Sequence, residues 1–187
     1  CVLASGREGL PGVAIEALTN SLAANDEPEV HAGYAHYRRP LLIAGAQLFE
    51  FRPVGASNAR SAYGRSSGVS LHAKAMVIDH HQVFIGSMNF DPRSRDLNTE
   101  MGVIVDSPGL ATAIERFFDR AAAPEKSFPV KLYPDSKRSP KNAPLRWTAV
   151  DDGKQVVFDH EPQSSWMKSL PVAVMSLLAP EDPLVVS

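Results

Sequence analysis

The residues best suited to chemistry lie between Leu71 and Glu100, in the stretch LHAKAMVIDHHQVFIGSMNFDPRSRDLNTE. His72 and Lys74 are separated by one residue, and Asp79 follows five positions after Lys74. Residues 71–79 alternate and are rich in apolar types, which predicts a β-strand. On one face of that strand, His72 and Lys74 would lie roughly 7 Å apart and could touch a single phosphate. Asp79 would face the other way, and we interpret it as a structural residue of a turn or an ion pair.

A second polar group follows in the order Gly-Ser-x-Asn, which places a hydroxyl at Ser87 and an amide at Asn89. A short polar connection and a returning strand are expected before it, which would bring Ser87 and Asn89 back beside His72 and Lys74. The ammonium, hydroxyl and amide groups can donate hydrogen bonds to phosphate oxygens. The imidazole can attack phosphorus or move a proton. Because Lys74 supplies the positive charge, we expect no metal and no other cofactor.

This set of residues resembles the H-x-K-x4-D motif of the phospholipase D superfamily, with its trailing G-S-x-N; the matching positions are His72, Lys74, Asp79, Gly86, Ser87 and Asn89. Glu100 is similar to the downstream acid of the family, which hydrogen-bonds the catalytic imidazole and so would fix its tautomer. The stretches 18–26, 31–34 and 89–100 resemble bacterial cardiolipin synthases with two motifs. That likeness points to the C-terminal half of the type-C-like branch.

The resemblance implies a phosphatidyltransferase that forms cardiolipin from phosphatidylglycerol and a second phospholipid through a phosphohistidine intermediate. One histidine attacks phosphorus, and the histidine of a second motif protonates the leaving alcohol. Lys74 and Asn89 would stabilise the phosphoryl charge, and Ser87 would orient an oxygen or the partner motif. His72 would be the general acid if this chain pairs with an N-terminal half, and would take both roles if it pairs with its own copy.

Only one H-x-K is present in the sequence, because no other histidine has a lysine two positions later. The second half is therefore expected either from polypeptide preceding Cys1, where the chain starts abruptly without Met, or from a homodimer mate. Two alternatives stay open: a homodimeric phosphodiesterase that cuts nucleic acid, and a catalytically silent half that only binds or pairs. The net charge of −2 and the pI near 6.3 disfavour nucleic acid.

The composition is that of a globular protein: 187 residues, 44% hydrophobic and 21% charged. The single cysteine excludes an internal disulfide, and no window of 18 apolar residues predicts a membrane span. No spacing of a zinc site and no G-x-S-x-G of a serine hydrolase is present. The resemblance implies peripheral contact with the bacterial inner membrane, and otherwise a cytoplasmic location.

The predicted elements are a strand at 13–18, a helix that begins near residue 28 and that Pro40 should kink or divide, and a strand at 47–52. This β-α-β order favours parallel pairing. The apolar run 101–105 predicts a buried strand, and Ser107-Pro108 a helix start. The fold class is therefore α/β, a mixed sheet flanked by helices on both faces, with the catalytic strand near the centre.

The domain prediction is a phospholipase D-like domain over 1–123, with 124–187 as an extension packed on it. A hairpin turn is expected at 151–153 and a final helix from 164 or 165. Three further residues are candidates for binding an anionic head group. They are Arg60 and Arg65, in the polar loop 53–70, and His31, in the H-A-G-Y segment.

Overall fold

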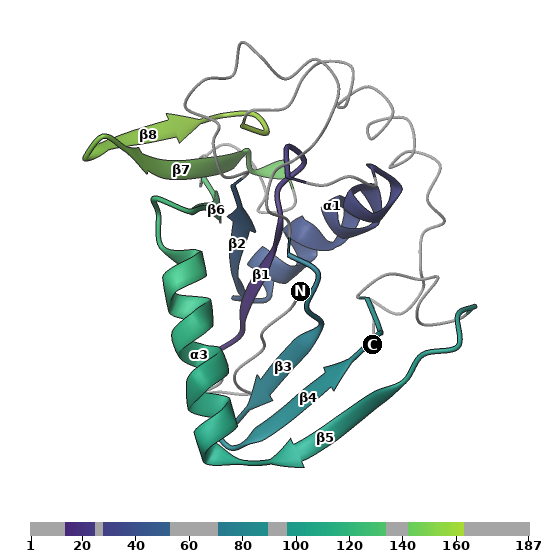
Figure 1. The fold of residues 1–187 in the computed structure, drawn as a ribbon. Helices are drawn as coiled ribbons and strands as arrows, with labels where there is room; N and C mark the ends of the chain where they lie inside the picture. The colour runs from purple at the N-terminus through teal and green to yellow at the C-terminus, as the bar shows by residue number, and fades with distance from the viewer. Residues whose placement is uncertain (1–13, 25–27, 53–70, 90–96, 134–141, 163–187) are drawn as a thin grey trace.

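The computed structural model describes residues 14–24, 28–52, 71–89, 97–133 and 142–162. Within this part the strands form two sheets, a five-stranded sheet in the order β1-β2-β6-β7-β8 and a three-stranded sheet in the order β3-β4-β5 (Figure 1). One pair is parallel and the others are antiparallel, as expected for a mixed α/β fold.

The β-α-β unit is confirmed as β1 (Glu16–Asn20), α1 (Pro28–Ile43) and β2 (Gln47–Phe51), with β1 and β2 parallel. The helix runs through Pro40 undivided. Gly45, at a φ of 95°, then ends it, because this left-handed conformation suits a residue without a side chain.

The two helices lie on opposite faces of the larger sheet. Side chains alternate along a strand. Ala17 packs in a cluster with Tyr34 and Leu41 of α1, whereas its neighbour Leu18 packs in a cluster with Phe118 of α3. The expectation of helices on both faces is therefore confirmed.

Helix α3 (Pro108–Ala122) follows β5 (Gly102–Asp106) and begins as predicted. The Ser107 hydroxyl accepts a hydrogen bond from the Leu110 N–H at 3.3 Å, and Pro108 occupies the first turn, where its missing N–H costs nothing. Phe118, Ala121 and Ala122 are buried on the inner face of this helix.

The strands after residue 124 continue the larger sheet: β6 (Ser127–Leu132), β7 (Leu145–Asp151) and β8 (Lys154–Phe158). β6 pairs with β2. The predicted hairpin at 151–153 is confirmed, with positive φ angles at Asp152 and Gly153 that suit a type I′ turn. The predicted final helix lies outside the described residues.

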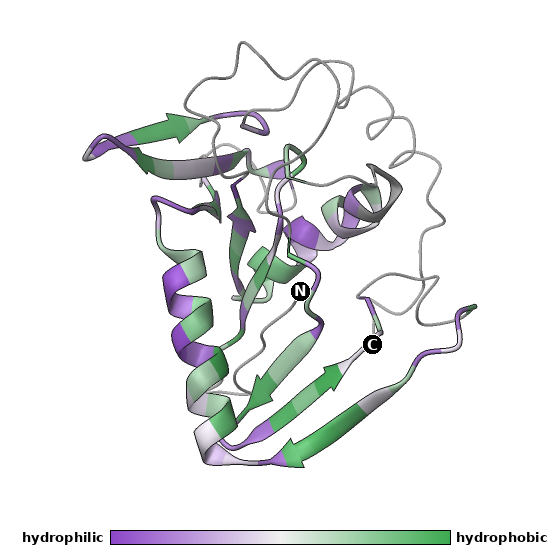
Figure 2. Cartoon of the chain, in the orientation of Figure 1, coloured by the Kyte–Doolittle hydropathy of each residue, from purple (hydrophilic) through white to green (hydrophobic). Residues whose placement is uncertain are grey.

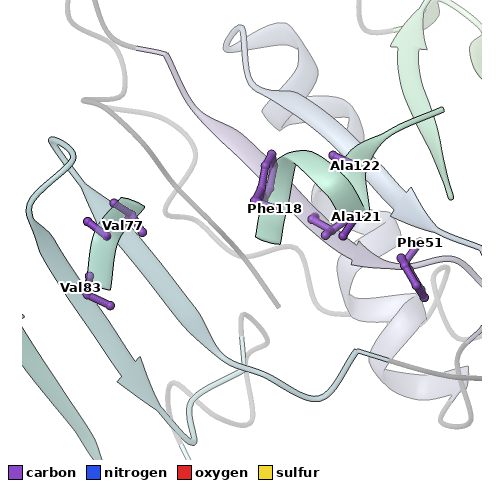
Figure 3. Packing of buried hydrophobic residues seen from close by; sticks show 8 residues of the cluster. Phe51, Val77, Val83, Phe118, Ala121 and Ala122 are labelled. Carbon is purple, nitrogen blue, oxygen red and sulfur yellow. The ribbon is translucent and has the colours of Figure 1, made fainter. Parts of the chain in front are cut away.

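The smaller sheet contains β3 (Ala75–Ile78), β4 (Gln82–Gly86) and β5, paired antiparallel in that order. Val77 and Val83 are fully buried in the cluster that also contains Leu18, Phe118 and Phe51, which joins the two sheets into one core (Figure 3).

The prediction that residues 101–105 form a buried strand is wrong. Every residue of β5 is exposed, and Ile104 retains 71% of its accessible surface. The physical reason is position: α3 packs on Val77 of β3 and Val83 of β4, whereas β5 is the edge strand on the other side of β4 (Figure 1). The expectation that the catalytic strand lies near the centre of its sheet is also wrong, because β3 is the other edge strand of the smaller sheet. No helix within the described part is long and apolar enough to cross a membrane.

Candidate active site

The smaller sheet gathers the motif residues at one end. Because its strands are antiparallel, β3 starts, β4 ends and β5 starts at the same end of the sheet (Figure 1). Lys74 lies directly before β3, Ser87 directly after β4, and Glu100 two residues before β5. Adjacent strands are about 4.8 Å apart, so the three strand ends at this end of the sheet span roughly 10 Å. The predicted return of the strand before Ser87 is confirmed by the antiparallel pairing of β4 with β3, and the clustering of the four side chains stays a prediction.

His72 and Lys74 lie just outside the strand that was predicted to hold them, because β3 begins at Ala75. Lys74 still belongs to the hydrogen-bond ladder, since its carbonyl accepts from the Gly86 N–H at 3.0 Å. The Lys74 ammonium bends back toward the His72 carbonyl, at 3.4 Å. The His72 side chain is exposed and that of Lys74 is half-buried, so both are open to a solvent-borne phosphodiester.

Ser87 and Glu100 form a hydroxyl–carboxylate pair at the same end. The Ser87 hydroxyl donates to the Glu100 carboxylate and accepts from the Met101 N–H at 3.0 Å. The Asn98 amide lies 3.4 Å from the same carboxylate. Ser87 therefore ties the end of β4 to the start of β5 and orients Glu100 at the rim of the sheet.

The chain bends at Ser87, directly after the last ladder residue Gly86. This bend matters because residues paired across an antiparallel ladder share a face. A regular continuation would place Ser87 opposite Ala73, on the face away from Lys74. The ladder between β3 and β4 ends at Gly86, while the Ser87 N–H still bonds the Met101 carbonyl at 2.8 Å. Asn89 follows this bend and is half-buried, and its approach to the H-x-K side stays a prediction.

The part of the chain that holds these groups matches a family model described as cardiolipin synthase, PLD-like domain, over residues 9–122. The chain belongs to this family.

Its relatives include cardiolipin synthase C of Escherichia coli (strain K12), which is 40% identical over 174 residues, covering 91% of this chain and 35% of that protein. The minor cardiolipin synthase ClsB of Bacillus subtilis (strain 168) is 33% identical over 123 residues, 66% of this chain and 27% of that protein. An uncharacterized protein of Helicobacter pylori (strain ATCC 700392 / 26695) is 31% identical over 169 residues, 86% of this chain and 31% of that protein. The chain thus spans about a third of the length of the curated relatives it matches. No solved structure gave a significant match.

In this PLD-like domain, Asn20 holds the segment that leads to His72, a role that the sequence did not reveal. The Leu71 N–H donates to Asn20 Oδ1 at 2.8 Å, and Asn20 Nδ2 donates to the Leu71 carbonyl at 3.0 Å. This two-bond clamp joins the end of β1 to the residue before the candidate catalytic imidazole. In the sequence, only the position of Asn20, a polar residue directly after the predicted strand 13–18 and Thr19, pointed to such a role.

Asp79 lies in the tight turn between β3 and β4, at a φ of 51°, and His80 follows at 63°. Asp is among the residues that tolerate this left-handed conformation best. Its position fits the structural interpretation of Asp79 as a turn residue.

His31 lies inside the fold and is only 1% exposed. Its Nε2 is 3.1 Å from Glu161 Oε1, and Arg38 lies 2.8 Å from the same carboxylate and 2.9 Å from that of Glu50. Burial and these contacts hold His31 within the α1 packing. Arg60 and Arg65, the other predicted head-group residues, lie outside the described residues.

The buried side chains of His31, Arg38 and Glu50 and the partly buried Glu161 form what we call the buried ion network. Burial raises the pKa of Glu50, while the charge of Arg38 opposes that rise. Burial also acts to raise the pKa of Glu161, but the His31 hydrogen bond and the Arg38 charge outweigh it and lower this pKa to about 2. Two further donors satisfy Glu50: the Trp147 indole at 2.9 Å and the Tyr34 hydroxyl at 3.2 Å.

The network was missed by reading the sequence, although part of it was visible there. His31, Tyr34 and Arg38 are spaced three and four residues apart and therefore share one face of α1. Their carboxylate partners come from β2 and from beyond β8, at distances along the chain that no local pattern encodes.

Proposed function

We propose that this chain is one catalytic half of a cardiolipin-synthase-type phosphatidyltransferase, which exchanges a phosphodiester through a phosphohistidine intermediate. The observation that supports the proposal is that the strand pairing puts the segments carrying His72, Lys74 and the Ser87–Glu100 pair at the same end of the smaller sheet, with His72 exposed. The 40% identity to cardiolipin synthase C over most of the chain supports this chemistry rather than another phosphodiesterase.

In the proposed first step, one imidazole nitrogen forms a bond to phosphorus while the bond from phosphorus to the leaving alcohol breaks. The imidazole of a second H-x-K motif supplies the proton that this alcohol takes. In the second step, the acceptor alcohol of phosphatidylglycerol returns a proton to that imidazole and displaces the first. The second motif must come from outside these 187 residues or from another copy, because the chain has one.

The charged groups of this chain would act on the phosphoryl oxygens throughout both steps. The Lys74 ammonium and the Asn89 amide would bind these oxygens and stabilise the charge that spreads over them in the transition state. Glu100, oriented by Ser87, would hold the His72 imidazole in one tautomer. The proposal places the protein at a membrane surface, because its substrates are phospholipids.

The test incubates vesicles of labelled phosphatidylglycerol with a longer polypeptide that contains this chain and follows lipid products by thin-layer chromatography. His72→Ala should reduce cardiolipin formation at least about a thousandfold, as for groups that act as a unit. The matched control is His160→Ala, an exposed histidine outside the motif, which should leave turnover unchanged.

A loss below tenfold for His72→Ala would show that this imidazole takes no part in the chemistry. A parallel assay for nicking of supercoiled DNA separates the alternatives. Nicking without cardiolipin would point to a nuclease, and neither product would point to a silent pairing half.

A further inference from the structure

β5 presents an apolar surface that a soluble protein does not normally leave open. All five of its residues are exposed, including Val103 and Ile104, and the preceding Met101 is exposed as well. Figure 2 shows the hydrophobic colouring along this strand, which forms the outer edge of the smaller sheet. The apolar sequence of residues 101–105 predicts a buried strand, but no element among the described residues packs over these side chains.

The backbone of β5 also has a free hydrogen-bonding edge. The Ser87 N–H bonds the Met101 carbonyl at 2.8 Å, and the Ser107 N–H bonds the His81 carbonyl at 2.8 Å. In an antiparallel ladder, hydrogen-bonded pairs alternate with non-bonded pairs. Residues 101, 103, 105 and 107 therefore direct their N–H and C=O groups to β4, and Gly102, Ile104 and Asp106 direct theirs to the open side.

This edge has few of the devices that protect natural sheet edges. Residues 102–105 contain no proline and no charged side chain, and Asp106, at the end of β5, is the one charged residue of the strand. An unguarded apolar edge readily accepts another strand by main-chain pairing.

We propose that the open edge of β5 is completed by an extended apolar strand from a longer polypeptide of which these 187 residues form part. The relatives are about three times as long as the region that this chain matches, so they contain ample chain to supply such a strand. A lipid surface fits poorly, because an open sheet edge leaves its N–H and C=O groups unsatisfied in hydrocarbon.

A second copy fits less well than a tethered strand. Pairing two five-residue strands alone falls well short of the roughly 1,200 Å² that a stable interface between separate molecules buries. A segment of the same polypeptide needs much less area, because its effective concentration is high.

The added strand would have a consequence for the candidate site, although the inference stands whether or not the proposed activity is correct. β5 begins next to Met101, whose N–H holds the Ser87 hydroxyl that orients Glu100. If β5 were paired with β4 on one side and with the added strand on the other, its first residues would be held in place, and so would the Ser87–Glu100 pair.

Amide hydrogen exchange, resolved by residue with NMR, tests the proposal without any substitution. The 187-residue chain is compared with a longer natural polypeptide that contains it. The outward amides of Gly102, Ile104 and Asp106 should exchange at least about tenfold more slowly in the longer polypeptide, as expected for added backbone hydrogen bonds. The inward amides of Val103 and Val105 serve as the internal reference and should change much less.

Three results would overturn the proposal. The first is equal exchange of the outward amides in both proteins. The second is protection in the 187-residue chain that disappears when Val172–Leu178 is deleted, which would make this apolar run of its own tail the occupant. The third is protection that rises with concentration while light scattering reports a doubled mass, which would make a second copy the occupant.

The melting temperatures of two matched variants test the proposed added strand independently. Ile104→Lys should lower the melting temperature of the longer polypeptide by several degrees and leave that of the 187-residue chain unchanged. Val157→Lys, at a 51% exposed position on the edge strand β8, should change neither. An equal effect of Ile104→Lys in both proteins would contradict the added strand, and if that variant does not fold, the exchange comparison decides.

Discussion

Replacing Glu161 with glutamine should destabilise the protein in a way that depends on pH. The carboxylate lies 3.1 Å from His31 Nε2 and 2.8 Å from Arg38, and only a fifth of its side chain is exposed. Its pKa falls from 4.5 to about 2 in the folded state, with burial opposing and the His31 hydrogen bond and Arg38 charge prevailing. At 1.36 kcal/mol per unit, this shift corresponds to about 3 kcal/mol of stability.

The sign of the pH dependence follows from the direction of the shift. A carboxyl whose pKa is depressed on folding contributes its stability above about pH 4.5, and this contribution is lost as the pH falls toward about 2. Glu50 acts in the opposite direction, because its pKa is raised by burial and acidification relieves its cost. Glu50 is present in both the native protein and Glu161→Gln, but the Glu161 charge also raises the Glu50 pKa, so the difference between the two proteins reports Glu161 together with this coupling.

Urea unfolding at several pH values measures this difference. Glu161→Gln should lose about 2–3 kcal/mol at pH 7, which for a chain of this size corresponds to a fall of about 4–12 °C in melting temperature. The loss should shrink steadily below pH 4.5. The matched control is Asp159→Asn, which removes an exposed carboxylate paired with Arg146 and should cost under about 0.5 kcal/mol.

Two results would refute this reasoning. A loss below about 0.5 kcal/mol for Glu161→Gln at pH 7 would mean that the buried ion network contributes little. A loss of equal size at pH 3 and pH 7 would mean that the charge of Glu161 is not what stabilises the fold.

Three further predictions concern the framework. Asn20→Ala should cost about 1–3 kcal/mol in urea unfolding, because it removes both bonds to Leu71 and leaves backbone groups unsatisfied; it should also lower turnover in the vesicle assay, and unchanged turnover would show that the bonds between Asn20 and Leu71 do not affect the candidate active site. Ser107→Ala should cost about 1 kcal/mol through loss of the α3 cap, and no change in unfolding would mean that the cap is dispensable. Gly153→Ala should cost roughly 1 kcal/mol at its φ of 74°, whereas Gly109→Ala, in helix α3 with open space around it, should be neutral or stabilising; the reverse order would contradict the turn geometry.

The elements that the sequence predicted well are those with local signals. The α3 start follows from Ser107 and Pro108, and the β7–β8 hairpin follows from Asp152 and Gly153, because each conformation is decided within a few residues. The motif could also be placed at one sheet end, because its strands are consecutive and joined by short connections.

The features that the sequence did not predict depend on distant parts of the chain. The buried ion network joins residues 38, 50 and 161, and the clamp joins residues 20 and 71. The exposure of β5 has a related cause. An apolar sequence indicates that a strand favours burial, but it does not indicate whether the described residues contain the element that would cover the strand. The roles of Asn89 and Glu100 in binding and orientation, and the boundary at residue 123, stay predictions.

The pairing of β6 with β2 limits where this polypeptide can be shortened. A chain that stopped at residue 123 would lack the strand that pairs with β2, would lose Phe128 and Val130 from the core, and would lose the Trp147 indole that donates to Glu50. We therefore expect a chain that ends at residue 123 to unfold at lower urea concentration than one that reaches Pro162, because β6 and β7 share a sheet and a core cluster with β2.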